Sequence, residues 1–437
     1  MSAAQRTYLA WAAAWLLTRA FMVVQAGFFN DVDGGQLQDV YLFHAWSDQL
    51  AGTHALPRSD NWQYPPLVAF LLLLPRVFDA PFGEAFVGLM LLVDLLGLVL
   101  VATLARRERR DAGVWAWLLL MPCMGAIPLL RFDLVPTVIA VGGLVAIRMR
   151  AFWLGALLGA GAMLKLWPLA VLLAERDRRR LLRAAAGVAV AAVAVFASAA
   201  LAFGDQSGFL DHQQQRGLQV EAIGATPWHV ARVVSGEPVA TVFRNGTNEL
   251  SAPLAATLAD GLGWLMLLLG LAAAGWWIMR ERIVRRGSVC GCERDSAGGA
   301  NGDESAADDG FHDDAARYLT SLAAGRDAVF TVVLLSIVVS RVLSPQFMIW
   351  LVGLVAVVLC SRETRLARPA WIVAAAVVMT VGLYPGAPAL ELSDVNPTTL
   401  VLRNVALLIA AGDASATMWR AVRPRDDGNR RTSAPTV

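Results

Sequence analysis

Apolar stretches of membrane-crossing length recur from one end of this chain to the other, and short arginine clusters separate them. A helix needs about 20 consecutive apolar residues to cross the roughly 30 Å hydrocarbon core of a bilayer. Hydrophobic residues make up 57% of the 437 positions and charged residues 16%, which is too apolar for a soluble domain of this length. The sequence therefore predicts an all-α polytopic membrane protein that lies in a lipid bilayer.

The arginine clusters predict how the chain threads through the bilayer, because cytoplasmic loops carry an excess of Lys and Arg. They lie at 106–110, 148–150, 176–183, 280–286 and 362–368, and in the tail from 420. Threading between them gives about 12 transmembrane helices in the plasma membrane, with both termini in the cytoplasm. The first apolar segment carries Arg19 and lacks a small-residue cleavage site, which favours a retained helix over a signal peptide. Arginines at helix ends orient the protein, so the net charge of +2 does not indicate binding to nucleic acid.

Composition divides the chain further. The expected parts are a transmembrane core at 1–281 with external loops at 29–83 and 204–254, a second group of helices at 327–418, and a cytoplasmic tail at 419–437. Between the two groups of helices, 282–326 is poor in apolar residues and rich in Gly, Ala and Asp, which is typical of a disordered cytoplasmic loop. Within the first external loop, 40–50 is predicted to be a short amphipathic helix. The apolar part of "WQYPPLVAFLLLLPRVF" is too short to cross comfortably and is expected to lie along the membrane surface.

Lys165 is the only lysine among 37 basic residues, and it interrupts an apolar run. The arginine clusters on either side of it lie only about 25 residues apart, so the chain must go out and back in two legs of about 12 residues, or 18 Å, each. The turn then falls at Lys165 and Pro168. We expect Lys165 to face the outer leaflet as a compact charge between two broken helices, the alternative being a lysine that only snorkels at a helix end.

The prominent polar residues fall on the predicted external side, where ionisable groups close to a membrane are costly and usually pair or act. They include Asp31, Asp33 and Asp39, with several cations from other loops. A carboxylate can take a proton from a hydroxyl, and cations can hold a leaving phosphate. The pattern therefore indicates a reaction between a phosphate-bearing lipid and a hydroxyl acceptor.

Six motifs occur in order along the chain: "DVYLFHAW", "WQYPPL", "RFDLVP", "LGAGAMLKLWPL", "RGLQVE" and "SPQFMIWL". Together they resemble the polyprenyl-phosphate-mannose-dependent mannosyltransferases of the GT-C fold, specifically glycosyltransferase family 87, from about residue 6 to 418. The resemblance implies an inverting α-mannosyltransferase that works on the extracytoplasmic face. Its partners would be a polyprenyl-phosphate sugar donor and a lipid or glycan acceptor of the cell envelope, and no metal or other cofactor is implied.

The resemblance also assigns roles to residues. Asp39 takes the place of the general base, and Lys165 and Arg341 match cations of the lipid-phosphate pocket. Tyr64 matches the wall of the site. Donor or acceptor contacts are expected for Arg216, Gln219 and Glu221, and further substrate contacts for Arg131, His44, Ser344 and Gln346. Family members often carry Lys and Tyr where this chain has Arg341 and Phe347, which leaves the identity of the sugar open.

Other interpretations remain beside these. Asp39 is also a preferred N-cap residue for the helix that follows it. Arg131 and Asp133 could form a purely structural ion pair, and Asp94 is expected to bond a neighbouring helix. The donor could carry another sugar, such as arabinose. A transporter would also explain broken helices and buried charge, although the charges here gather on one face and no internal repeat is found.

Overall fold

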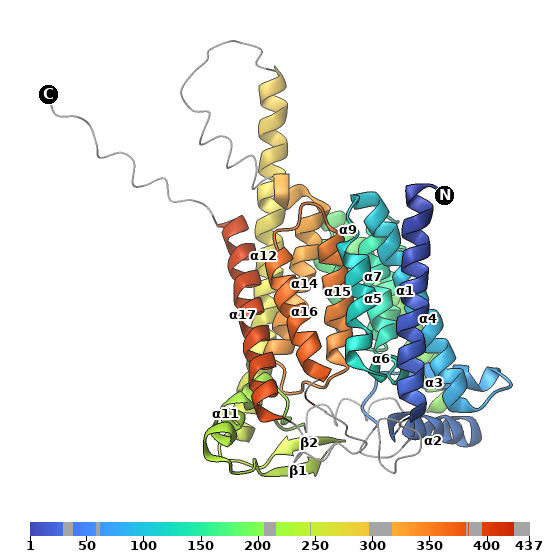
Figure 1. Ribbon diagram of the computed structural model, residues 1–437. Coiled ribbons are helices and arrows are strands. Elements are labelled where there is room, and N and C mark those ends of the chain that lie inside the picture. The colour runs from blue at the N-terminus through green and yellow to red at the C-terminus, as the bar shows by residue number, and fades with distance from the viewer. Residues whose placement is uncertain are drawn as a thin grey trace.

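The computed structural model describes residues 1–28, 38–57, 62–204, 216–244, 246–296, 317–381, 383 and 396–423. Its helices stand side by side in one bundle (Figure 1). Helix α1 begins and α17 ends at the same end of the bundle, which we call the terminal end. Helices α2 and α11 and a β-hairpin lie at the opposite end, which we call the loop end.

Five helices in the described part of the chain are long and apolar enough to cross a bilayer. They are α1 (Ala3–Phe28), α4 (Phe82–Glu108), α9 (Arg178–Phe203), α12 (Ala255–Ser296) and α17 (Pro397–Val422). The shorter helices of the bundle are α5 (Ala112–Leu120), α6 (Ile127–Leu130), α7 (Leu134–Val145), α8 (Ala151–Ala162), α14 (Leu322–Val338), α15 (Phe347–Cys360) and α16 (Ala367–Val381). The predominantly helical membrane architecture agrees with the sequence, and the count of about 12 crossings stays a prediction.

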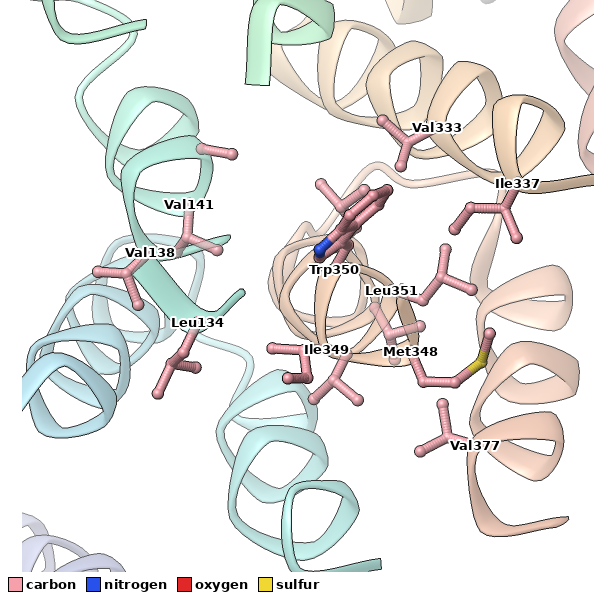
Figure 2. Packing of buried hydrophobic residues seen from close by; sticks show 14 of the residues in the cluster. Leu134, Val138, Val141, Val333, Ile337, Met348, Ile349, Trp350, Leu351 and Val377 are labelled. Carbon is pink, nitrogen blue, oxygen red and sulfur yellow. The ribbon is translucent and has the colours of Figure 1, made fainter. Parts of the chain in front are cut away.

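Helix α15 occupies the centre of the bundle. All of its residues from Met348 to Cys360 are buried, and α5, α7, α14 and α16 pack around it. Figure 2 shows Leu134, Val138 and Val141 of α7 on one side of α15 and Val333 and Ile337 of α14 on another. Because such closely packed side chains move little, the first turn of α15 has a fixed position at the loop end.

The chain breaks at Lys165 as expected. Helix α8 is 12 residues long and ends at Ala162, and the 3-10 helix η3 (Trp167–Ala174) begins after a short turn. Pro168 occupies the first turn of η3, where its missing N–H costs no hydrogen bond. The amide N of Lys165 still bonds the Gly161 carbonyl at 2.9 Å, so the last turn of α8 fixes where this lysine lies.

Glycines bring α8 and α9 into close contact along their length. A Cβ atom at Gly155 would lie 1.8 Å from the carbonyl oxygen of Ala184, and one at Gly187 would lie 2.0 Å from that of Phe152. Gly155 and Gly159 are four residues apart, the spacing that lets the backbones of membrane helices approach each other. The leg that leads to Lys165 is therefore held against α9.

Gly155→Val should lower the stability of the purified protein by about 1–3 kcal/mol, because the new side chain forces α8 away from the α9 backbone. The measurement is thermal unfolding in detergent. Gly88→Val in α4 is the matched control, since a Cβ there meets nothing within 4 Å. Equal melting temperatures for the two variants would show that the close α8–α9 contact contributes nothing.

A buried ion pair joins α1 to α4. Arg19 contacts Asp94 through two hydrogen bonds of 2.8 Å, and Asp94 also accepts from the indoles of Trp15 at 2.5 Å and Trp117 at 3.0 Å. Asp94 therefore bonds neighbouring helices α1 and α5, as the sequence predicted. Removing one partner of such a pair would leave an uncompensated charge, so the pair fixes how these three helices fit together.

Two helices reach into the segment 282–326. Helix α12 continues to Ser296, and α14 begins at Leu322 with Ser321 as its N-cap. Just before α14, Leu319 is fully buried and its carbonyl accepts from the Arg280 guanidinium at 3.0 Å. Both ends of the expected loop are thus helical or packed against the bundle. The rest of it, 297–316, lies outside the described residues.

The loop end contains the elements expected in the first external loop. Helix α2 (Gln38–Thr53) covers the predicted amphipathic helix, and α3 (Leu67–Leu73) with the 3-10 helix η1 (Leu74–Val77) is short, as expected. The second external loop contains elements that we did not predict. These are α11 (Thr226–Ser235) and an antiparallel hairpin of β1 (Thr241–Arg244) and β2 (Thr247–Leu250). Gly246, in the turn, has a φ of 68°, a conformation that glycine adopts without strain.

Candidate functional site

One large cavity, of about 2280 Å³, extends from the loop end into the bundle. Polar side chains gather in it at the loop end: Asp39, Gln63, Tyr64, Arg131, Lys165, Arg216, Gln219, Glu221, Arg341, Ser344 and Gln346. Farther along, η3, α12 and α14 line it with apolar residues such as Leu169, Leu172, Met266 and Val333. It also reaches Arg178, at the start of α9. Ten of the eleven residues assigned from the sequence therefore share one cavity with a long apolar wall.

Lys165 lies in a cage of one carboxylate and three aromatic rings. Its Nζ donates to Asp133 at 2.6 Å, and the indole of Trp350 donates to the same carboxylate oxygen at 2.9 Å. The rings of Phe132, Phe347 and Trp350 have their centroids 5.2 to 5.5 Å from this Nζ, within the range of cation–π attraction. The lysine therefore points in a fixed direction, between the start of α7 and the first turn of α15.

Asp39 forms an ion pair with Arg131, and both side chains are about a quarter exposed. Asp39 comes from the first turn of α2, whereas Arg131 directly follows α6 with extended backbone. The motif "RFD" thus provides Arg131 to Asp39 and Asp133 to Lys165. The structure therefore pairs Arg131 and Asp133 with different residues and not with each other. It also places the candidate base, Asp39, beside the positive charge of Arg131.

Tyr64 forms part of the wall beside these pairs. Its ring packs edge-on against Phe132, with centroids 5.0 Å apart, and against Trp46 and Trp62. Burial raises the pKa of Tyr64 to about 12. Its hydroxyl therefore stays protonated at neutral pH and can donate a hydrogen bond into the cavity.

Hydrogen bonds connect the segment 216–221 to the connection between α14 and α15. The guanidinium of Arg341 donates to the Arg216 carbonyl at 3.0 Å, and the Gln219 amide N donates to the Arg341 carbonyl at 2.9 Å. The side chain of Gln219 bonds the Ser344 hydroxyl at 3.2 Å. Two motifs that lie 125 positions apart thus form one wall, with two guanidinium groups beside the cavity.

Glu221 and His44 differ from the other sequence-assigned residues. Glu221 pairs with the fully buried Arg403 of α17 at 3.3 Å, so its carboxylate holds the loop to the bundle although it lines the cavity. His44 does not line this cavity. It stacks on Phe82 at 4.8 Å and lies 3.6 Å from Asp48, on another face of α2. Asp31 and Asp33, the other carboxylates considered, are outside the described residues.

Sequence reasoning missed several side chains of the site. Asp133 was considered beside Arg131 but not as the partner of Lys165, and Trp350 and Arg403 were not considered. The hairpin residues Phe243 and Asn248, which line the mouth of the cavity, were also missed. Among the residues that the structure describes, no three His, Cys, Asp or Glu side chains come together as a metal site.

The arrangement combines a carboxylate, several cations and an apolar wall in one cavity. The sequence profile of glycosyltransferase family 87 matches residues 62–292, more than half of the chain. The protein belongs to glycosyltransferase family 87. No curated protein and no solved structure matches it.

Membership in family 87 makes this protein a membrane glycosyltransferase. The matched range contains Tyr64, Arg131, Lys165 and the segment 216–221. Asp39 lies before it, and Arg341 lies after it. The structure places these two residues, which the profile match does not cover, beside the same cavity as the matched residues.

Proposed function

We propose that this glycosyltransferase moves mannose from a polyprenyl-phosphate donor to a hydroxyl of a cell-envelope glycolipid or glycan. The observation that carries the proposal is the cavity, which joins a carboxylate and four cationic side chains at the loop end to an apolar wall inside the bundle. A lipid with an anionic head and a long hydrocarbon chain has the same division into polar and apolar parts. The active site then lies on the extracytoplasmic face, and the termini lie in the cytoplasm.

The donor phosphate would lie among Lys165, Arg216 and Arg341. All three line the cavity at the loop end, and guanidinium groups can bind phosphate oxygens in pairs. The polyprenyl chain would follow Leu169 and Leu172 of η3, where burial of each CH₂ contributes about 0.8 kcal/mol. This placement leaves the sugar of the donor at the mouth, near Asp39.

Asp39 would act as the general base. It takes the proton of the acceptor hydroxyl while that oxygen forms a bond to C1 of the sugar. The bond between C1 and the phosphate oxygen breaks on the opposite side, which inverts the configuration at C1. The electron pair of that bond leaves with the polyprenyl phosphate, whose charge the cations stabilise. Arg131 orients the Asp39 carboxylate before the acceptor arrives.

The test uses the full-length protein in liposomes, with radiolabelled polyprenyl-phosphate mannose or polyprenyl-phosphate arabinose and an extract of envelope lipids as acceptor. We expect labelled glycolipid from the mannose donor, and about 10²- to 10⁴-fold slower formation of it with the Asp39→Asn variant. Product from the arabinose donor alone would show that the transferred sugar is arabinose and not mannose, while the proposed type of reaction would stand. Movement of intact donor across the bilayer without product from either donor would instead favour a transporter.

A further inference from the structure

The β1–β2 hairpin places an aromatic side chain, Phe243, at the mouth of the cavity. The proposed donor site does not use this side chain. Phe243 is 69% exposed, and it lines the cavity mouth together with Gly246, Thr247 and Asn248. Phe243 and Asn248 lie directly opposite each other in the strand register, so their side chains share one face of the hairpin. An aromatic ring and an amide therefore face the mouth side by side.

The hairpin is attached firmly to the donor side of the cavity. The Leu250 amide donates to the Leu218 carbonyl at 2.8 Å, and the Val220 amide donates to the Asn248 carbonyl at 3.1 Å. The Glu249 carboxylate accepts from the Gly217 amide at 2.9 Å. Because the segment 216–221 is itself bonded to Arg341, the hairpin face keeps a fixed position relative to the phosphate-binding cations.

The two walls of the mouth offer different chemistry. Asp39 and Gln63 line the mouth from the first external loop, and Phe243 and Asn248 line it from the hairpin. The negative face of an aromatic ring attracts C–H groups, which a sugar ring presents on its flat side. The amide of Asn248 can both donate and accept hydrogen bonds, as sugar hydroxyls require.

We propose that this hairpin face, formed by Phe243 and Asn248, binds a sugar ring of the acceptor. The inference rests on the proposed function and names the acceptor as a glycan or glycolipid whose reacting hydroxyl is on a sugar. With its ring stacked on Phe243, the acceptor lies between the hairpin and Asp39, which line the same mouth. The hairpin then selects the acceptor, and the cations bind the donor.

A different role for Phe243 would be to insert into the membrane surface. Leu254, nearby in sequence, is 74% exposed, so apolar contact with lipid is a real alternative. The two roles differ in what can replace the phenyl ring. Leucine keeps the apolar character that a lipid contact needs, whereas only an aromatic residue keeps the stacking surface.

The kinetic test uses radiolabelled polyprenyl-phosphate mannose as donor and octyl α-mannoside as acceptor, with the full-length protein in nanodiscs. Phe243→Ala and Asn248→Ala should each raise the KM for octyl mannoside about 3- to 10-fold and leave the KM for the donor unchanged. Phe243→Trp should stay near the wild type, and Phe243→Leu should behave like Phe243→Ala. Val242→Ala, on the other face of β1, is the matched control. Full activity of Phe243→Leu would overturn the sugar subsite in favour of a lipid contact.

A binding measurement keeps this inference separate from the proposed reaction. Saturation-transfer difference NMR of octyl mannoside, recorded with the nanodisc protein and no donor, reports contact with the sugar protons. Contact that Phe243→Ala removes and Val242→Ala retains supports the subsite, even where no transfer is detected and the proposed reaction fails. Absence of contact in the wild type, or equal contact in Phe243→Ala, overturns it.

Discussion

Asp39→Asn is expected to lower sugar transfer by about 10²- to 10⁴-fold, the range that general-base catalysis contributes. The amide keeps the size of the carboxylate and can still accept a hydrogen bond from Arg131, but it cannot take the proton of the acceptor. Binding of the donor should change little, because the proposed phosphate contacts come from other residues. The measurements are turnover with saturating substrates and, separately, retention of labelled donor by the purified variant.

Asp48→Asn is the matched control for this prediction. Asp48 lies on the same helix α2 and also pairs with an arginine, Arg76, yet it lines a separate depression outside the large cavity. This control should keep the activity of the wild type. If Asp39→Asn also turned over at the wild-type rate, Asp39 would serve only as a structural partner of Arg131 in the first turn of α2, and Asp31 and Asp33 would become the carboxylates to test.

Lys165→Met should lower transfer by about 2–4 kcal/mol, or roughly 30- to 900-fold, if the ammonium group stabilises the leaving phosphate. Lys165→Arg should restore little of the loss. The cage of three aromatic rings fits a compact ammonium group, whereas a planar guanidinium is wider and binds phosphate in two places. Donor affinity and turnover are measured for both variants.

Lys165→Met also leaves Asp133, which is only 2% exposed, without its counter-charge. The single variant is therefore expected to lose stability as well as transfer. The double variant Lys165→Met with Asp133→Asn removes both charges and should recover the thermal stability that Lys165→Met loses. Transfer should stay low in the double variant if the lysine contacts phosphate. Recovery of wild-type transfer in the double variant would show that Lys165 serves only as the partner of Asp133.

Local sequence patterns determined much of the architecture. The lengths of the apolar runs predicted membrane helices, and the spacing of the arginine clusters predicted two short legs around Lys165, as α8 and η3 show. Two further features were accessible but missed. The dipeptide Asn-Gly at positions 245–246 is a common sequence signal for a two-residue turn between strands, and it would have indicated the hairpin. His44 follows Asp39 by five positions, about 140° around a helix, so it could not share the face of Asp39.

The pairing of charges was decided only by the tertiary structure. Nothing near Arg131 in the sequence distinguishes Asp133, two positions away, from Asp39, 92 positions earlier, as its partner. The choice follows from how α2 lies over the ends of α6 and α7, which depends on packing throughout the bundle. Glu221 and Arg403 are likewise joined across 182 positions. Periodicity and charge spacing report contacts within an element or between neighbouring ones, because they arise from the geometry of a single helix or strand. Contacts between distant elements form only when the whole bundle has packed, and those contacts bring the candidate base, the cations and the hairpin around one cavity.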